Sequence, residues 1–184
     1  MKKLLLATAV LAASSATLAA GPQYTYVQGQ WQESEWDDNS AADLDGFGAA
    51  GSIDLNKEFF AFAQYANVDD RGFDVDRFAI GAAYKMPLSV RTDLNFGAGI
   101  VSYDVGSRYG VDDDDSGLLL TAGIRSMLND NLELGAGASY EDAYDIDMLV
   151  NVYGAWHFNR QLSAGLSLTE GDVETTAIYV RMAF

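Results

Sequence analysis

The side chains whose chemistry stands out first are carboxylates gathered between predicted strands, above all four consecutive aspartates: Asp112, Asp113, Asp114 and Asp115. Carboxylate oxygens are preferred ligands of Ca²⁺, which takes about six to eight oxygens. The run lacks the alternate spacing and the glycine of an EF-hand loop, and no other segment has that pattern. We therefore interpret the run as a solvated acidic loop that attracts divalent cations, with a specific calcium site as the alternative.

A second group of charged residues flanks two short predicted turns. Lys85 and Asp93 lie on either side of one turn, and Arg125 and Glu133 lie on either side of the next. Each pair is expected to be cross-strand neighbours within reach of an ion pair. Three further residues are expected at a similar depth: Asp54, His157 and Arg181. The sequence predicts that these residues form a mixed-charge cluster with a structural role, and selectivity or gating is the alternative.

Catalysis is not expected from these residues. His157 is the only histidine, and it lies between two aromatic residues at the end of a predicted strand. The chain has no Gly-x-Ser-x-Gly motif, phosphate loop or dinucleotide fingerprint. It also has no cysteine, which excludes disulfides and thiolate metal sites. We expect no cofactor, and the formal net charge of −16 argues against nucleic-acid binding.

The first twenty residues have the features of an export leader. Lys2 and Lys3 form a short basic region, residues 4–13 are apolar, and residues 14–20 are mostly small. The sequence therefore predicts a signal peptide over residues 1–20, cleaved after Ala19 or Ala20, and a single mature domain over residues 21–184. A short N-terminal membrane anchor is the alternative.

From Tyr24 onward, large apolar residues alternate with small or polar ones, which is the period of a β-strand. We predict ten strands, with eight as the alternative count. Their predicted ranges are 24–32, 46–55, 58–67, 75–85, 92–102, 117–126, 132–141, 147–157, 161–169 and 174–184. No later segment has about eighteen consecutive apolar residues, as a transmembrane helix would need.

The connections between these strands alternate between short turns and longer acidic segments. Segments 33–45 and 103–116 are examples of the long kind, whereas residues 56–57 and 158–160 are examples of the short kind. Short periplasmic turns that alternate with longer extracellular loops are typical of bacterial outer-membrane barrels. The pattern therefore predicts an even number of strands with both chain ends on the periplasmic side.

The two faces of each predicted strand differ in a way that favours lipid outside the barrel. In segment 132–141, Leu134 and Tyr140 share one face, while Gly135 and Gly137 lie on the other. Glycine weakens a solvated strand, but it fits a narrow lumen that is crowded from all sides. Ten residues tilted by about 40° span roughly 25 Å, the height of an outer-membrane apolar band. The alternative is a water-soluble β-sandwich whose core contains the aromatic residues of the strands.

The last residues carry a sequence pattern of their own. The chain ends in Phe184, with apolar residues at the alternate positions before it: Ile178, Val180 and Met182. This pattern resembles the C-terminal signature of outer-membrane barrels, and the resemblance implies recognition by the barrel-assembly machinery.

Short internal motifs extend the resemblance over the mature chain. They are Tyr24-Thr25-Tyr26-Val27, Asp45-Gly46-Phe47-Gly48, Thr92-Asp93-Leu94, Gly123-Ile124-Arg125-Ser126-Met127 and Asn131-Leu132-Glu133-Leu134. In these motifs the chain is similar to a family of small outer-membrane barrels first described as proposed activators of plant immunity. The resemblance implies an OmpA-like or porin-like barrel, and it transfers no catalytic residues.

Together these observations predict an all-β protein, a closed antiparallel up-and-down transmembrane β-barrel in a Gram-negative outer membrane. Its expected partners are outer-membrane lipid, lipopolysaccharide and divalent cations. Two functions remain open, with a slight preference for the first: a narrow porin-like channel that favours cations, or a non-conducting barrel that acts through its acidic loops. A protein released for signalling is a third possibility.

Overall fold

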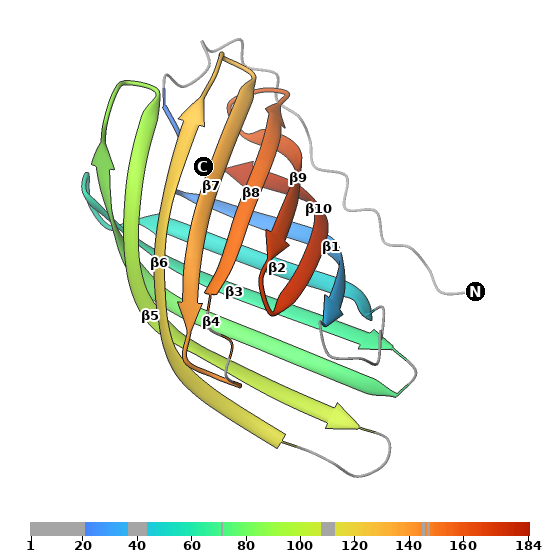
Figure 1. Cartoon of the computed structure of the whole chain (residues 1–184). Coiled ribbons are helices and arrows are strands. Elements are labelled where there is room, and N and C mark those ends of the chain that lie inside the picture. The colour runs from blue at the N-terminus through green and yellow to red at the C-terminus, as the bar shows by residue number, and fades with distance from the viewer. Residues whose placement is uncertain (1–20, 37–43, 71, 108–112, 145, 147) are drawn as a thin grey trace.

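The computed structural model describes residues 21–36, 44–70, 72–107, 113–144, 146 and 148–184, and within them the chain forms a closed barrel of ten antiparallel strands (Figure 1). The strands are β1 (Tyr26–Trp36), β2 (Leu44–Asp54), β3 (Phe59–Asp70), β4 (Phe73–Pro87), β5 (Thr92–Ser107), β6 (Asp113–Met127), β7 (Leu132–Glu141), β8 (Met148–His157), β9 (Leu162–Glu170) and β10 (Val173–Ala183). The predicted fold class and the count of ten are confirmed.

Closure comes from the pairing of the first strand with the last. β1 runs antiparallel to β10, with Trp31 opposite Ile178, and every other strand pairs with its neighbours in the sequence. In Figure 1 the blue β1 accordingly lies beside the dark red β10. A closed ring leaves no unpaired strand edge, which would cost several kcal/mol per unsatisfied backbone group in lipid. No helix in the described part of the chain is long and apolar enough to cross a membrane.

Local side-chain chemistry fixes the four short turns that set the strand register. Asn56, Asn129 and Asn159 each occupy the same place in a turn, and each Oδ1 accepts two backbone N–H groups at 2.8–2.9 Å. In the remaining turn, Oγ of Ser89 accepts the backbone N–H of Arg91. Asparagine and serine favour turns because they can bond to backbone two residues ahead. We call this end of the barrel the turn side and the opposite end the loop side.

The large apolar residues face outward. Leu120, Leu134 and Ile178, from three different strands, are all exposed on the outer surface. Their sequence neighbours Leu119, Glu133 and Tyr179 face the lumen and are buried. Successive side chains of a strand point to opposite faces, so one register puts every second residue outside. The arrangement is the inverse of a water-soluble core, as the alternation predicts.

The strands on one side of the barrel are longer than predicted. β5 and β6 continue to Ser107 and back to Asp113, whereas the sequence predicted strand ends at residues 102 and 117. In Figure 1 these strands extend well beyond β7–β10. The predicted ends mark the place where the outward side chains change from apolar to polar, from Ile100 to Ser102 on β5. Backbone pairing continues past that place because polar side chains in water do not prevent it.

Candidate functional site

The lumen at the turn side is filled by a cluster of polar side chains around one buried carboxylate. We call this the floor cluster: Arg125, Glu133, Tyr153, His157 and Arg181. Glu133 is 0% exposed. Its Oε1 accepts Nη2 and Nε of Arg125 at 2.8 and 3.0 Å and the hydroxyl of Tyr153 at 2.8 Å. Its Oε2 lies 3.1 Å from Nε2 of His157.

Arg181 completes the floor cluster but lies at the edge of these contacts. Its Nη1 is 3.6 Å from Oε1 of Glu133, beyond hydrogen-bond distance, while its Nε donates to Oε1 of Gln28 at 3.1 Å. The guanidinium also lies over the rings of Tyr26 and Tyr179, at 4.4 and 5.3 Å from their centroids. Cation–π contacts of this kind stabilise a guanidinium that has left water.

Lys85 and Asp93 lie close enough to interact electrostatically, but the predicted salt bridge between them does not form. Lys85 forms its ion pair with Asp54 of β2, across β3. Register does not separate the two predicted pairs: Lys85 faces Asn95 and Asp93 faces Pro87, just as Arg125 faces Gly135 and Glu133 faces Met127. The difference is that Asp93 lies opposite Arg125 on β6, while Lys85 reaches Asp54. Of the seven residues predicted to cluster, the structure brings Arg125, Glu133, His157 and Arg181 into one group and joins Lys85 to Asp54. The seventh, Asp93, lies opposite Arg125 and interacts electrostatically with both Arg125 and Lys85.

Tyr24, just before β1, reinforces the floor from below. Its ring is buried, packs on Phe60 at a centroid distance of 4.6 Å, and lies beneath Nζ of Lys85 and the guanidinium of Arg125 at 4.7 and 4.5 Å. Sequence analysis placed Tyr24 in a strand and gave it no role in the site.

Two inward glycines make room for the tyrosines of the floor. A Cβ atom on Gly135 would lie 2.2 Å from the ring of Tyr153, and a Cβ on Gly165 would lie 2.6 Å from the ring of Tyr179. No ring can approach another residue so closely. Gly135 and Gly165 are therefore required where the tyrosine of a neighbouring strand packs over the glycine backbone.

A second ion pair, which the sequence did not predict, joins half-buried Arg77 to buried Glu141 at the loop side. Nη2 and Nε of Arg77 lie 2.5 and 3.1 Å from the two carboxylate oxygens of Glu141, which is buried. The hydroxyl of Tyr103 donates to the same carboxylate at 2.6 Å. Glu141 ends the predicted strand 132–141 on the same face as Gly135 and Gly137. Its inward parity at the end of strand 132–141 was the available signal.

An apolar cluster closes the lumen beside this ion pair. Its buried members are Leu44, Val68, Val75, Ala79, Val101, Tyr103, Leu119, Ala143 and Ile146. Ala143 and Ile146 come from the connection between β7 and β8, which returns to the barrel wall where the backbone N–H of Asp142 bonds to the carbonyl of Leu118 at 2.9 Å. The segment therefore caps the mouth of the barrel with apolar side chains.

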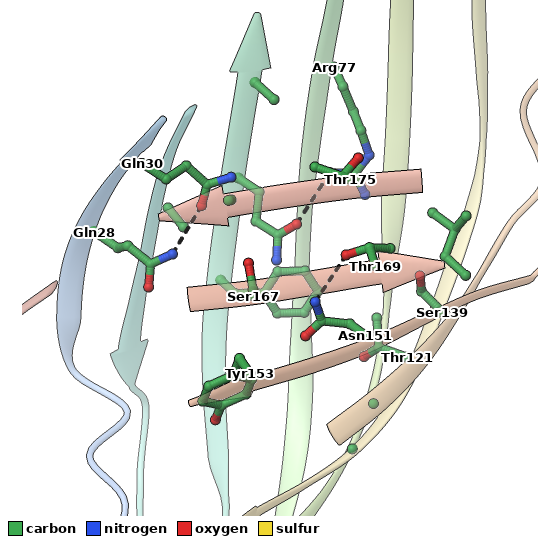
Figure 2. Close-up of a pocket in the computed structure, with 18 of the residues that line it drawn as sticks. Gln28, Gln30, Arg77, Thr121, Ser139, Asn151, Tyr153, Ser167, Thr169 and Thr175 are labelled. Atoms are coloured by element: carbon green, nitrogen blue, oxygen red, sulfur yellow. Dashed lines mark hydrogen bonds between the residues drawn. The ribbon is translucent and has the colours of Figure 1, made fainter. Parts of the chain in front are cut away.

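Between the two ends lies a chamber of about 430 Å³. Figure 2 shows the side chains of Gln28, Gln30, Asn151 and Thr169 around this space. Nδ2 of Asn151 donates to Oγ1 of Thr169 at 3.0 Å, and Nε2 of Gln28 donates to Oε1 of Gln30 at 3.0 Å. Other uncharged polar residues complete the wall: Gln32, Thr121, Ser139, Ser167 and Thr175. The chamber wall thus combines apolar residues with amides and hydroxyls, and charged groups lie at its two ends.

The candidate calcium ligands do not form a chelating group. Asp113, Asp114 and Asp115 are exposed residues of β6 rather than of a loop, and Asp112 lies outside the described residues. No set of three or more side chains suited to hold a metal ion occurs in the described part of the chain. The signal peptide predicted over residues 1–20 also lies outside it.

Acidic residues instead form two cross-strand rows on the outer face, where the apolar surface ends. In each row, residues of neighbouring strands are directly opposite each other. The first row is Glu33, Asp45, Asp69 and Asp74; the second is Asp76, Asp104 and Asp114. We call these the acidic rows. Like charges directly opposite each other on a sheet are destabilising.

These features agree with the comparison against known families. Residues 4–183 match the family model described as outer membrane protein beta-barrel domain. The chain belongs to this family. As a member of the outer-membrane β-barrel family, it is an outer-membrane protein. No curated protein matches it significantly.

Solved barrels share the fold at low sequence identity. The KdgM porin, solved with disordered oligogalacturonate, is 9% identical, with 87% of this chain and 99% of that chain covered at a TM-score of 0.52. The N-terminal β-barrel domain of Pseudomonas aeruginosa OprF is 12% identical, with 89% and 100% covered at a TM-score of 0.50. Neisserial surface protein A is 15% identical, with 86% of this chain and 96% of that chain covered at a TM-score of 0.48.

In this outer-membrane β-barrel the C-terminal pattern lies on the lipid-facing surface. Ile178, Val180 and Met182 project outward from β10, and Phe184 follows the strand at the turn side. The same strand contributes Arg181 to the floor cluster from its other face. β10 therefore serves closure, the outer surface and the site together.

Proposed function

We propose that the protein is an outer-membrane barrel that is closed to solute flow at rest and acts mainly at the cell surface. The observation that carries the proposal is that buried side chains narrow the lumen at both ends. Buried Arg125 and Glu133 and the ring of Tyr24 occupy the turn side, and Ala143 and Ile146 cap the loop side. A permeating solute would have to displace a buried ion pair or an apolar cluster, and each displacement costs free energy.

The acidic rows support a role at the surface. Asp104 lies between Asp76 and Asp114, so three carboxylates face one another next to the apolar band. Divalent cations would relieve this repulsion, and they would also bridge to the phosphates of lipopolysaccharide. We therefore propose that the acidic rows contact lipopolysaccharide through such cations. Calorimetry on the refolded barrel tests this: Ca²⁺ is expected to give heat beyond the nonspecific screening seen with Na⁺, and its absence would remove the cation from the proposal.

A porin-like channel for small solutes is the second candidate, and the chamber favours it. A space of about 430 Å³, with amides and hydroxyls in its wall, could take a small solute. The acidic rows would raise the local concentration of cations and so favour them over anions. In this candidate the floor cluster is the gate.

Conductance across a planar lipid bilayer separates the two candidates. The refolded wild-type protein is expected to give a silent bilayer. Arg125→Ala removes the guanidinium that fills the turn side, and it is expected to lower the thermal stability of the barrel. Discrete wild-type steps with a cation-biased reversal potential would overturn the closed barrel and support the channel. Arg91→Ala, which removes an exposed guanidinium in a turn, is the matched control.

A further inference from the structure

The floor cluster holds more buried positive charge than its carboxylate can bind. Arg125 and Arg181 are each 8% exposed, and both approach Glu133. Arg125 makes two hydrogen bonds to Oε1 of Glu133 and also faces Asp93 across the β5–β6 ladder. It is therefore well compensated by acidic groups.

Glu133 has little capacity left for the second guanidinium. Its Oε1 already accepts two N–H groups of Arg125 and the hydroxyl of Tyr153, and its Oε2 contacts His157. Oε1, the oxygen nearest Arg181, has two lone pairs for three donors, so it has no capacity for a fourth; the remaining capacity of the carboxylate is on Oε2, beside His157. The distance of 3.6 Å between that oxygen and Nη1 of Arg181 follows from this saturation.

Nη1 of Arg181 is accordingly a buried donor without a hydrogen-bond partner among the described residues. The residues directly opposite Arg181 on the two neighbouring strands are Gln28 and Ser163, and both are uncharged. Arg181 also lines the chamber. A buried polar group that lacks a partner calls for a ligand or ordered solvent, and a guanidinium is best satisfied by an anionic oxygen.

The chamber wall defines the rest of such a ligand. Amides and hydroxyls on several strands, among them Gln30, Ser139, Asn151 and Thr169, offer both donors and acceptors to hydroxyl groups. The volume of about 430 Å³ falls in the range of small-molecule sites. We propose that the chamber is a binding site for a small hydroxylated carboxylate, whose carboxylate pairs with Arg181 and whose hydroxyls bond to the polar wall. This site would exist whether or not the barrel conducts.

Gluconate and sorbitol form a matched pair of probes, because they share a six-carbon polyol skeleton and differ in the carboxylate. The full mature chain is refolded in detergent with each radiolabelled probe, which avoids the need to pass either closed end. Unbound probe is removed by gel filtration, and folding is checked by heat-modifiable migration. Gluconate is expected to be retained at about one per barrel and at least about tenfold better than sorbitol, since one buried charged pair is at stake.

Two variants test whether gluconate binds in the chamber beside Arg181. Arg181→Gln is expected to abolish the preference for gluconate, whereas Arg91→Gln, in an exposed turn, is expected to retain it. Ser167→Leu narrows the chamber and leaves Arg181 in place, so it tests the site even if Arg181→Gln fails to fold. Equal retention of the two probes, no retention of either, chloride competing as well as gluconate, or retention of gluconate by Ser167→Leu would each overturn the proposal.

Discussion

Glu133 is the residue on which the interior of the turn side depends. It is fully buried, and four donor atoms from β6 and β8 converge on its carboxylate. Without its negative charge, Arg125 and Arg181 would lie in the lumen with insufficient compensation. Breaking a buried ion pair by removing one partner is strongly destabilising, because the other charge stays buried.

Glu133→Gln is therefore expected to destabilise the folded barrel by about 3–5 kcal/mol. The measurement is urea unfolding of the refolded protein, followed by tryptophan fluorescence. Asp130→Asn is the matched control, because its ion pair with Arg91 is exposed, and exposed pairs contribute about 0–1 kcal/mol. An equal loss of stability in both variants would contradict this account of the floor cluster.

Gly135 gives a second test at a single position. A Cβ at this residue would overlap the ring of Tyr153, whereas nothing lies within 4 Å of a Cβ on Gly29. Gly135→Ala is expected to cost about 1–3 kcal/mol as Tyr153 is displaced, and Gly29→Ala is expected to be nearly neutral. Thermal unfolding of the two variants distinguishes this steric effect from a general effect of alanine in strands. A general effect would shift the Tm of both variants equally.

Individual strands show how far the sequence determines the fold. β7 has the predicted range, 132–141, because an Asx turn begins it and the alternation is strict. β5 and β6 exceed their predicted ranges, because the end of an apolar outer row marks the edge of the lipid band and not the end of pairing. Register alone does not decide which charges pair, because Lys85 and Asp93 have the same diagonal relation as Arg125 and Glu133, and only the second pair forms a salt bridge.

The candidate site was predictable only where partners flank one turn. Arg125 and Glu133 both face the lumen from adjacent strands and meet diagonally, since Arg125 lies opposite Gly135 and Glu133 opposite Met127. Arg77 and Glu141 belong to β4 and β7 and meet across the lumen. Such contacts depend on barrel diameter and strand stagger, which alternation does not specify. The position of Ala143 could not be predicted either, because it depends on the path of the connection between β7 and β8, which the alternation of residues does not specify.

The last strand carries a prediction about assembly in the cell. Phe184 and Phe158 are both exposed aromatic residues at the turn side, but only Phe184 ends the C-terminal pattern. Phe184→Ala is expected to lower the amount of barrel in the outer membrane while leaving refolding in detergent intact. Phe158→Ala is expected to change neither. Quantitative blotting of membrane fractions measures this, and parallel losses in both variants would argue against an assembly signal.

For the complete barrel, stability rests on lipid as the surrounding solvent. Outward residues such as Leu166 and Val180 are exposed, while the lumen is occupied by ion pairs, amides and hydroxyls. Backbone groups find partners around the closed ring. The same inversion accounts for the closed lumen, since small inward residues let the large ones of opposite walls meet.

Spin-label accessibility along β9 and β10 in lipid vesicles tests this inversion directly, and the absence of cysteine from the chain permits single labels. Labels at Leu166, Leu168, Ile178 and Val180 are expected to show high accessibility to dissolved oxygen, which concentrates in lipid. Labels at Ser167, Thr169, Thr175 and Ala177 are expected to show low oxygen accessibility. A two-residue period with this phase supports the lipid-facing barrel; the opposite phase, or no period, would contradict it.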